Sequence, residues 1–353
     1  MLIKLLNTLL MVVVALSITG VIHRTRAVLA GRRGIRFLQH IYNVRLLLRK
    51  GAVYSPTTTI LFRIAPCVYL GAALMAFLFI PIADLEPLFS FHGDIILVAY
   101  LLAFSRFALI LAAMDTGSSF EGMGAAREAL YGALVEPALM MGLATLALFC
   151  GDSSFAAIFS HGQVLDVNLT VVLLLVAYIF VMIMFIEGGR VPVDDPKTHL
   201  ELTMIHEVMC LDYSGIDLAM INIAGWLKNA IWAVIAANAV SVALCFHWEF
   251  ATPLAILGTG ITIGCIESLR ARNKLSRNIT YILTIVAMAA LVLLFGNTEY
   301  LQGLMGGKNV ILFICTFVGK SKTHGRYKKR TYMALARTRN SLERDWYIPY
   351  YAH

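Results

Sequence analysis

Long apolar runs recur along the whole chain, and short polar segments that carry most of the charged residues separate them. One helical crossing of a bilayer needs about 20 consecutive apolar residues. In lipid only helices and closed barrels satisfy every backbone polar group, and continuous runs lack the alternation of barrel strands, so helices are expected. Eight spans are predicted, near residues 3–22, 58–80, 94–114, 131–150, 168–187, 217–245, 250–267 and 279–296.

The composition agrees with a chain embedded in a membrane. Hydrophobic residues make up 59% of the sequence and charged residues 14%, against roughly 25% charged in soluble domains. We predict an all-α integral membrane protein with a membrane domain over 1–297 and a basic extension over 298–353. A run near 300–319 leaves a ninth crossing open. Lys4 before the first run also fits a signal peptide, but no small-x-small cleavage pattern follows it, so an uncleaved helix is expected.

Basic residues collect in alternate loops. The loop 23–57 is rich in arginine and lysine, whereas 81–93 and 151–167 carry acidic residues and no arginine or lysine. By the positive-inside rule the odd-numbered loops face the cytoplasm and the amino terminus lies outside, in the inner (cytoplasmic) membrane of the cell. The basic tail segment 320–344 returns to the cytoplasm only if the ninth crossing exists. We expect it to contact anionic membrane lipid and not nucleic acid.

Ionisable residues also lie within the apolar runs and at the end of the fifth. Such residues are costly in lipid, so they are expected to face the protein interior, where they pair or meet water. A proton or ion path is the functional interpretation, with some residues serving only to fix helix packing. A close set of carboxylates titrates as a group, so no single base is assigned. The predicted path residues are Glu136, Glu187, Asp194, Glu201, Glu207, Asp212, Lys228 and Glu267.

Metal and nucleotide chemistry are not expected on this chain. The six cysteines are scattered without a CxxC pair and are expected to be small buried hydrophobes. His199 and His206, with Glu201 and Glu207, are suitable ligand types but lack the HExxH spacing. Neither a GxGxxG after a strand nor a Walker loop is present.

The segment after the fifth run carries a family resemblance. Glu187-x-x-Arg190-x-Pro192-x-Asp194, then Glu201-Leu202 and Asp212-Tyr213-Ser214-Gly215, resembles subunit 1 of respiratory complex I and its relatives. The spelling Val-Asp-Asp-Pro at 193–196 and the stretch 199–207 are more similar to the membrane subunit of formate hydrogenlyase and related group 4 nickel–iron hydrogenases. Segments within 31–55 and 115–137 agree, although the first departs from the usual pattern at Ile35, His40, Asn43 and Leu46.

The resemblance implies an eight-helix, complex I subunit 1-like bundle beneath a hydrophilic electron-transfer module. The chain would be a non-catalytic subunit that couples redox chemistry to proton or sodium movement. Implied partners are hydrogenase-like large and small subunits, an iron–sulfur subunit and antiporter-like membrane subunits. The nickel–iron and iron–sulfur centres would lie on those partners, with no cofactor on this chain. Implied supporting or docking residues are Arg32, Arg33, Arg106, Arg127, Arg190, His199, His206, Arg270 and Arg272.

Three alternatives remain open. The same subunit in complex I forms a quinone chamber, so a quinone-oxidoreductase subunit is the nearest of them. A secondary transporter also uses charges at the membrane midplane, but it predicts inverted repeats, and no internal repeat is seen. The third is a pure anchor, whose buried charges only hold partner loops.

Overall fold

A computed structural model describes residues 2–82, 85–160, 167–194, 204–244 and 251–296. The predicted ninth crossing, the basic tail, His199 and Glu201 lie outside these residues. The described part is helical and contains no strand. Its elements are α1 (Leu2–Leu29), α2 (Gln39–Leu47), α3 (Ile60–Phe77), α4 (Asp94–Asp115), α5 (Ser119–Cys150), α6 (Phe155–Ser160), α7 (Val167–Glu187), the 3-10 helix η1 (Glu207–Cys210), α8 (Gly215–Ala243), α9 (Ala251–Leu269) and α10 (Leu275–Gly296).

Eight of the described helices are long and apolar enough to cross a membrane, which confirms the all-α membrane fold. They are all of the α-helices except α2 and α6. Two of them extend far beyond the predicted spans, and α10 begins four residues earlier than predicted, at Leu275. α1 continues past 22 to Leu29, and α5 begins at Ser119 instead of 131. Charged residues lower the hydropathy of both extensions, but a helix can continue through them because its backbone groups are paired internally.

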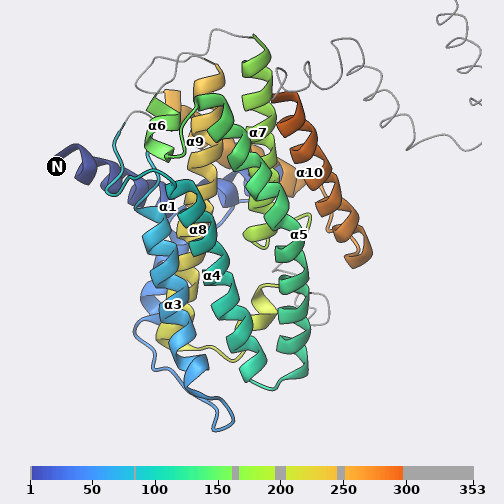
Figure 1. The fold of residues 1–353 in the computed structure, drawn as a ribbon. Helices are drawn as coiled ribbons and strands as arrows, with labels where there is room; N and C mark the ends of the chain where they lie inside the picture. The colour runs from blue at the N-terminus through green and yellow to red at the C-terminus, as the bar shows by residue number, and fades with distance from the viewer. Residues whose placement is uncertain (1, 83–84, 161–166, 195–203, 245–250, 297–353) are drawn as a thin grey trace, which may run out of the picture. The chain divides into compact units, whose positions relative to one another are not determined.

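α8 lies at the centre of the bundle, in contact with α1, α3, α7 and α9 (Figure 1). α7 packs between α8, α5 and α10, and α7 and α8 have the most buried membrane spans. Large apolar side chains on the outer helices remain exposed, as a lipid-facing surface requires, among them Tyr100, Phe104 and Phe107 on α4. The charged residues of α7 and α8 therefore lie inside the protein and not against lipid.

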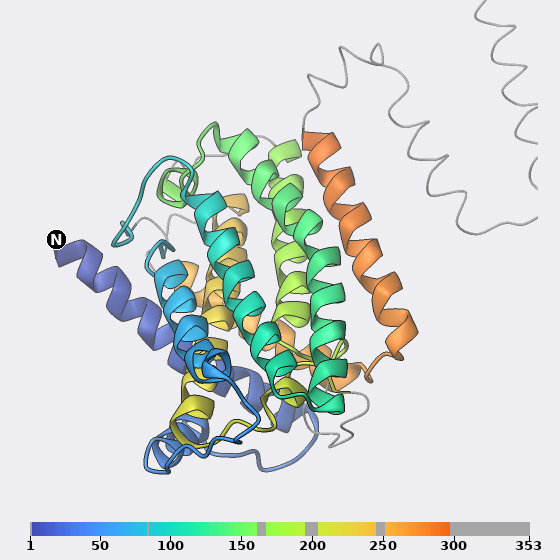
Figure 2. The same cartoon turned by 60° about the horizontal axis from the view of Figure 1, so that its bottom comes forward.

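α1 crosses the bundle obliquely and packs on α9 and α8 (Figure 2). Two glycines of α9, Gly260 and Gly264, form the contact. A Cβ at Gly260 would lie 3.0 Å from Ile18 Cδ1, and one at Gly264 would overlap Thr25 Oγ1. Glycines four apart let two helix backbones approach closely, as in membrane helix pairs generally. This packing brings the end of α1 beside the end of α9.

The connections rich in charge lie at one end of the bundle, the lower end in Figure 1. There α1, α4, α7 and α9 end and α3, α5, α8 and α10 begin, so the segments 30–59, 116–118, 188–194, 204–214 and 270–274 lie at this end. We call this the site end.

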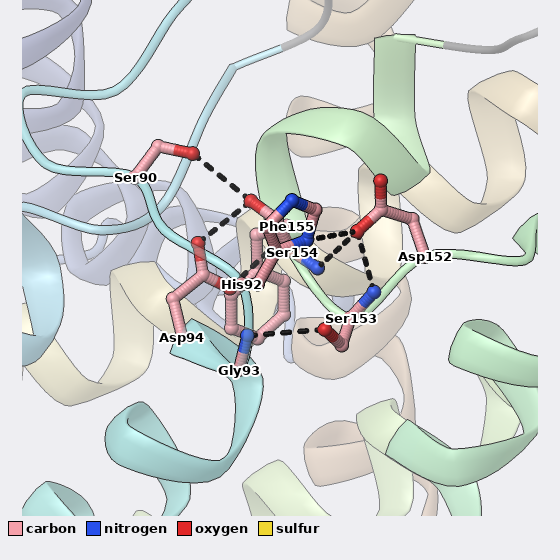
Figure 3. Close-up of polar contacts among 8 residues, drawn as sticks. All are labelled: Ser90, His92, Gly93, Asp94, Asp152, Ser153, Ser154 and Phe155. Carbon is pink, nitrogen blue, oxygen red and sulfur yellow. Dashed lines mark hydrogen bonds and ion pairs between the residues drawn. The ribbon is translucent and has the colours of Figure 1, made fainter.

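At the opposite end, a polar cluster joins the start of α4 to the turn after α5 (Figure 3). Asp94 accepts hydrogen bonds from Ser154 Oγ at 2.8 Å and from the Phe155 backbone N–H at 2.8 Å. His92 Nδ1 lies 3.3 Å from Asp152 Oδ1. Asp94 thus accepts from a free backbone N–H group at the start of α6, and we interpret the cluster as structural.

Candidate functional site

Glu187, the last residue of α7, lies between two cations from neighbouring helices. One carboxylate oxygen pairs with Arg106 of α4, and the other lies 3.5 Å from Lys228 Nζ of α8. Arg106 Nη2 also lies 3.8 Å from Glu136 Oε1 of α5. Lys228 Nζ lies 5.3 Å from the centre of the Tyr69 ring of α3, within cation–π range. We call these five residues the inner charge cluster.

Three of the four charged members of this cluster are deeply buried. The side chains are 11% exposed in Arg106, 5% in Glu187 and 4% in Lys228, whereas Glu136 is 42% exposed. Removing one partner from a buried charge group leaves an uncompensated charge, which is strongly destabilising. Glu187 is therefore the member whose charge both cations need. Glu136 lies at the edge of the cluster.

Glu267, near the end of α9, joins two other elements. Its Oε1 lies 3.0 Å from Arg190 Nη1, and its Oε2 lies 3.7 Å from Arg26 Nη1 of α1. The Glu267 side chain is 4% exposed. One buried carboxylate thus holds both α1 and the segment after α7, and we call the three residues the Glu267 clamp.

Asp194 fixes the segment that follows α7. Its Oδ2 accepts hydrogen bonds from the backbone N–H groups of Ile205 at 3.0 Å and His206 at 3.1 Å. Its Oδ1 lies 3.6 Å from Arg272 Nη2, between α9 and α10. Asn278 of α10 donates to the Val193 carbonyl at 2.9 Å. The segment is therefore tied to α10 on one side and to the residues before η1 on the other.

A cavity of about 650 Å³ opens between these groups at the site end. The inner charge cluster contributes Glu187, Lys228 and Tyr69 to its wall, and the Glu267 clamp contributes all three of its residues. Four buried polar atoms in the wall have no hydrogen-bond partner within the described residues. They are Thr19 Oγ1, Arg190 Nε, His206 Nδ1 and Asn229 Oδ1. Such atoms are satisfied by water or by a polar ligand, so the cavity is suited to hold one.

His206 is neutral in this wall at pH 7. Burial lowers its pKa to about 4, and the nearby positive charge of Lys228 acts in the same direction. A neutral imidazole offers one donor and one acceptor. Its ring therefore adds hydrogen-bonding capacity to the cavity without adding charge.

The other predicted residues lie around this core. Arg127 donates to the Met204 carbonyl at 3.2 Å and so supports the same segment as Asp194. Glu207 and Asp212 are exposed at the site end, and the Asp212 backbone N–H donates to Glu121 at 3.0 Å. Exposed positions at this end are also held by three predicted docking residues, Arg32, Arg33 and Arg270.

Four residues of the site were not predicted. Arg26 falls in the predicted first loop, because the predicted first span ends at 22. Glu121 and Glu128, both buried, precede the predicted start of the fourth span at 131. Nothing in the sequence marks Tyr69 as a site residue, since a tyrosine in an apolar run is most simply a core residue. If the first and fourth spans had been predicted at their full length, Arg26, Glu121 and Glu128 would have been recognised as charged residues within membrane helices.

Within the residues that the structure describes, no three His, Cys, Asp or Glu side chains gather as a metal ion would require. The histidine and glutamate pairs at 199–207 fall partly outside that range, and their interpretation stays a prediction.

The profile of the NADH dehydrogenase family matches residues 3–338, which extends past the segments that carried the resemblance. Hydrogenase-4 component C of Escherichia coli is 33% identical over 253 residues, covering 71% of this chain and 78% of that protein. Formate hydrogenlyase subunit 4 of Escherichia coli is 31% identical over 229 residues, covering 64% and 73%. An NADH-quinone oxidoreductase subunit of Orientia tsutsugamushi is 25% identical over 194 residues, 54% of each chain.

A solved structure has the same fold. A chain of the membrane-bound sulfane sulfur reductase, an archaeal respiratory membrane complex, matches with a TM-score of 0.66 and covers 84% of this chain and 99% of its own length. The two sequences are 19% identical, so this likeness supports the arrangement of the helices alone.

Proposed function

Because the chain belongs to the NADH dehydrogenase subunit 1 family, as a membrane subunit of a complex I-like respiratory complex, we propose that it serves a hydrogenase of the formate hydrogenlyase type. In this proposal it docks the electron-transfer module at the site end. It couples electron transfer to the movement of protons or sodium. The observation that carries the proposal is the buried inner charge cluster directly beside a polar cavity at the docking end.

The hydrogenase branch is favoured over the quinone branch by sequence. The two relatives named for hydrogenase and formate hydrogenlyase are 33% and 31% identical, against 25% for the quinone oxidoreductase subunit over a shorter stretch. The nickel–iron and iron–sulfur centres would lie on partner subunits, and antiporter-like subunits would continue the path along the membrane.

The site end offers the docking surface. Arg32, Arg33 and Arg270 are exposed at this end. Basic residues of this kind steer and orient a partner of opposite charge more than they add affinity. By the positive-inside rule this end faces the cytoplasm.

Coupling follows from electrostatics over short distances. At an effective dielectric constant of about 20, a unit charge arriving about 10 Å away changes the energy of a carboxylate by roughly 1.5 kcal/mol, or about one pKa unit. An electron reaching a docked centre would therefore change the proton affinity of the groups at the cavity wall. The ion pairs of Glu187 and Glu267 would pass that change between helices.

Replacement of Glu187 tests the proposal. In purified complexes reconstituted into vesicles, Glu187→Gln should leave the subunits assembled and electron transfer measurable, while the ions moved per electron fall sharply. Glu86→Gln, which removes an exposed carboxylate at the opposite end, is the matched control. An assembled Glu187→Gln complex that transports ions like the wild type would support the pure anchor instead.

The cavity favours a second candidate function, the binding of a quinone. Its volume suits a small ring, and three of the unsatisfied groups, Thr19 Oγ1, Arg190 Nε and His206 Nδ1, can donate to the two carbonyl oxygens. Trp226 lines the cavity and reports on its occupation. Saturable quenching of tryptophan fluorescence by decylubiquinone, lost in Trp226→Phe, would support this candidate, and quenching that does not saturate would exclude it.

A further inference from the structure

Glu128 occupies a defined position on the inner face of α5. Residues four apart lie one above the other on a helix, about 6 Å apart, so Gly124, Glu128, Gly132 and Glu136 form one row. At one end of the row, a Cβ at Gly124 would lie 3.0 Å from the Ile205 carbonyl oxygen. Further along, one at Gly132 would lie 2.5 Å from Cζ of Arg106.

The two glycines thus mark what α5 meets on either side of Glu128. On one side is the segment that Asp194 holds through the N–H group of Ile205. On the other is the guanidinium of Arg106, which belongs to the inner charge cluster. Glu128 lies between them, close enough to interact electrostatically with Glu187, Arg106 and Lys228 of the inner charge cluster and with Asp194.

The surroundings of Glu128 differ from those of the other buried carboxylates. It is 8% exposed, and within the described residues its side chain has neither a hydrogen-bond donor nor an ion-pair partner. By contrast, Glu187 and Glu267 are each held by two cations. Glu121, on the same helix, accepts a hydrogen bond from a backbone N–H. A carboxylate without a fixed partner can bind and release a proton without breaking an ion pair.

We propose that Glu128 is a proton-carrying residue between the Asp194 segment and the inner charge cluster. This inference rests on the proposed coupling function and assigns one step of it. The Glu128 carboxylate takes up a proton from the site end and becomes a neutral acid. It then gives the proton to the carboxylate of Glu187, which lowers the negative charge between Arg106 and Lys228, and Glu128 returns to its ionised form.

The test uses the whole complex in vesicles, with proton movement followed by a pH-sensitive dye and electron transfer followed in parallel. Glu128→Gln keeps the shape of the side chain and removes its proton exchange, so protons moved per electron should fall by about tenfold or more. Glu128→Asp keeps a carboxylate and should recover part of the loss. Glu86→Gln is the control, because it removes an exposed carboxylate at the opposite end of the bundle.

The outcomes separate this inference from the proposal on which it rests. Loss in Glu128→Gln with recovery in Glu128→Asp supports a proton carrier, since a packing role would not distinguish the two in this way. Normal proton movement in Glu128→Gln, together with loss in Glu187→Gln, overturns the role of Glu128 and leaves the coupling function standing. Normal movement in both variants overturns the coupling function itself. If Glu128→Gln does not assemble, Glu128→Ala takes its place, and wild-type proton movement in that variant overturns the inference.

Discussion

The Nζ atom of Lys228 lies 3.5 Å from Oε2 of Glu187, and both side chains are at most 5% exposed. The pair connects the centre of α8 to the last residue of α7. A cation at this depth is tolerated only because the carboxylate is there, and the same carboxylate also holds Arg106. The pair therefore has measurable consequences for stability as well as for coupling.

A double-mutant cycle measures this pair. Lys228→Met leaves the buried carboxylate of Glu187 with Arg106 alone, and Glu187→Gln leaves both cations without their carboxylate, so each should lower the free energy of unfolding. The double variant should lose less than the two losses added together, with a coupling energy of about 1–3 kcal/mol. Thermal unfolding of the purified complex gives the three differences. Strict additivity would show that the two residues do not interact.

Asp194→Asn should loosen the segment before η1. The carboxylate accepts two backbone N–H groups and pairs with Arg272, so the change should cost about 1–3 kcal/mol locally. Amide hydrogen exchange at Ile205 and His206 should become faster. Asp212→Asn, an exposed position, should leave these two amides unchanged. Equal exchange in the Asp194 variant and the wild type would contradict the anchoring role.

Much of the fold follows from the hydropathy pattern, because eight apolar runs allow few other arrangements in lipid. The ends of helices are less predictable. Arg26 and Glu128 lower the local hydropathy, so the predicted first span ends and the predicted fourth span begins too far inside the helix. In the structure both residues face the protein interior, where a charge does not interrupt a membrane helix.

The sequence predicts several residues of the candidate site, but it does not predict which of them form ion pairs with one another. Glu187 and Arg190 are noticeable because they lie in a segment rich in charged residues. Nothing in the local sequence indicates that Arg106, 81 residues earlier, pairs with Glu187. Such pairs depend on how α4 and α7 pack, which one sequence does not reveal. The roles of the predicted path residues stay predictions, and those of His199 and Glu201 concern positions outside the described structure.

Gly264→Ala should weaken the packing of α1 on α9. The added methyl group would overlap the Thr25 hydroxyl, and such overpacking costs about 1–3 kcal/mol. A lower midpoint of thermal unfolding is expected. Gly258→Ala is the matched control, since nothing lies within 4 Å of a Cβ there. If both variants unfold at the same temperature, close approach of the two helices is not needed at this point.

His206 should make the stability of the site end depend on pH. Its pKa falls from the usual 6.5 to about 4 in the folded protein, because burial and the charge of Lys228 disfavour the imidazolium. Between these values the unfolded chain binds the proton and the folded chain does not. Stability from this residue is therefore complete above about pH 6.5 and decreases as the pH falls toward 4, by roughly 3 kcal/mol at most.

Comparison with His206→Asn isolates that contribution from the carboxylates that titrate in the same range. Asparagine cannot take up a proton, so the difference in unfolding free energy between wild type and variant should stay constant above pH 6.5 and shift in favour of the variant below it. Thermal unfolding at intervals from pH 4.5 to 7.5 follows the difference. A difference that does not vary with pH would mean that His206 titrates alike in the folded and unfolded chains, and that the cavity wall leaves the ring open to water.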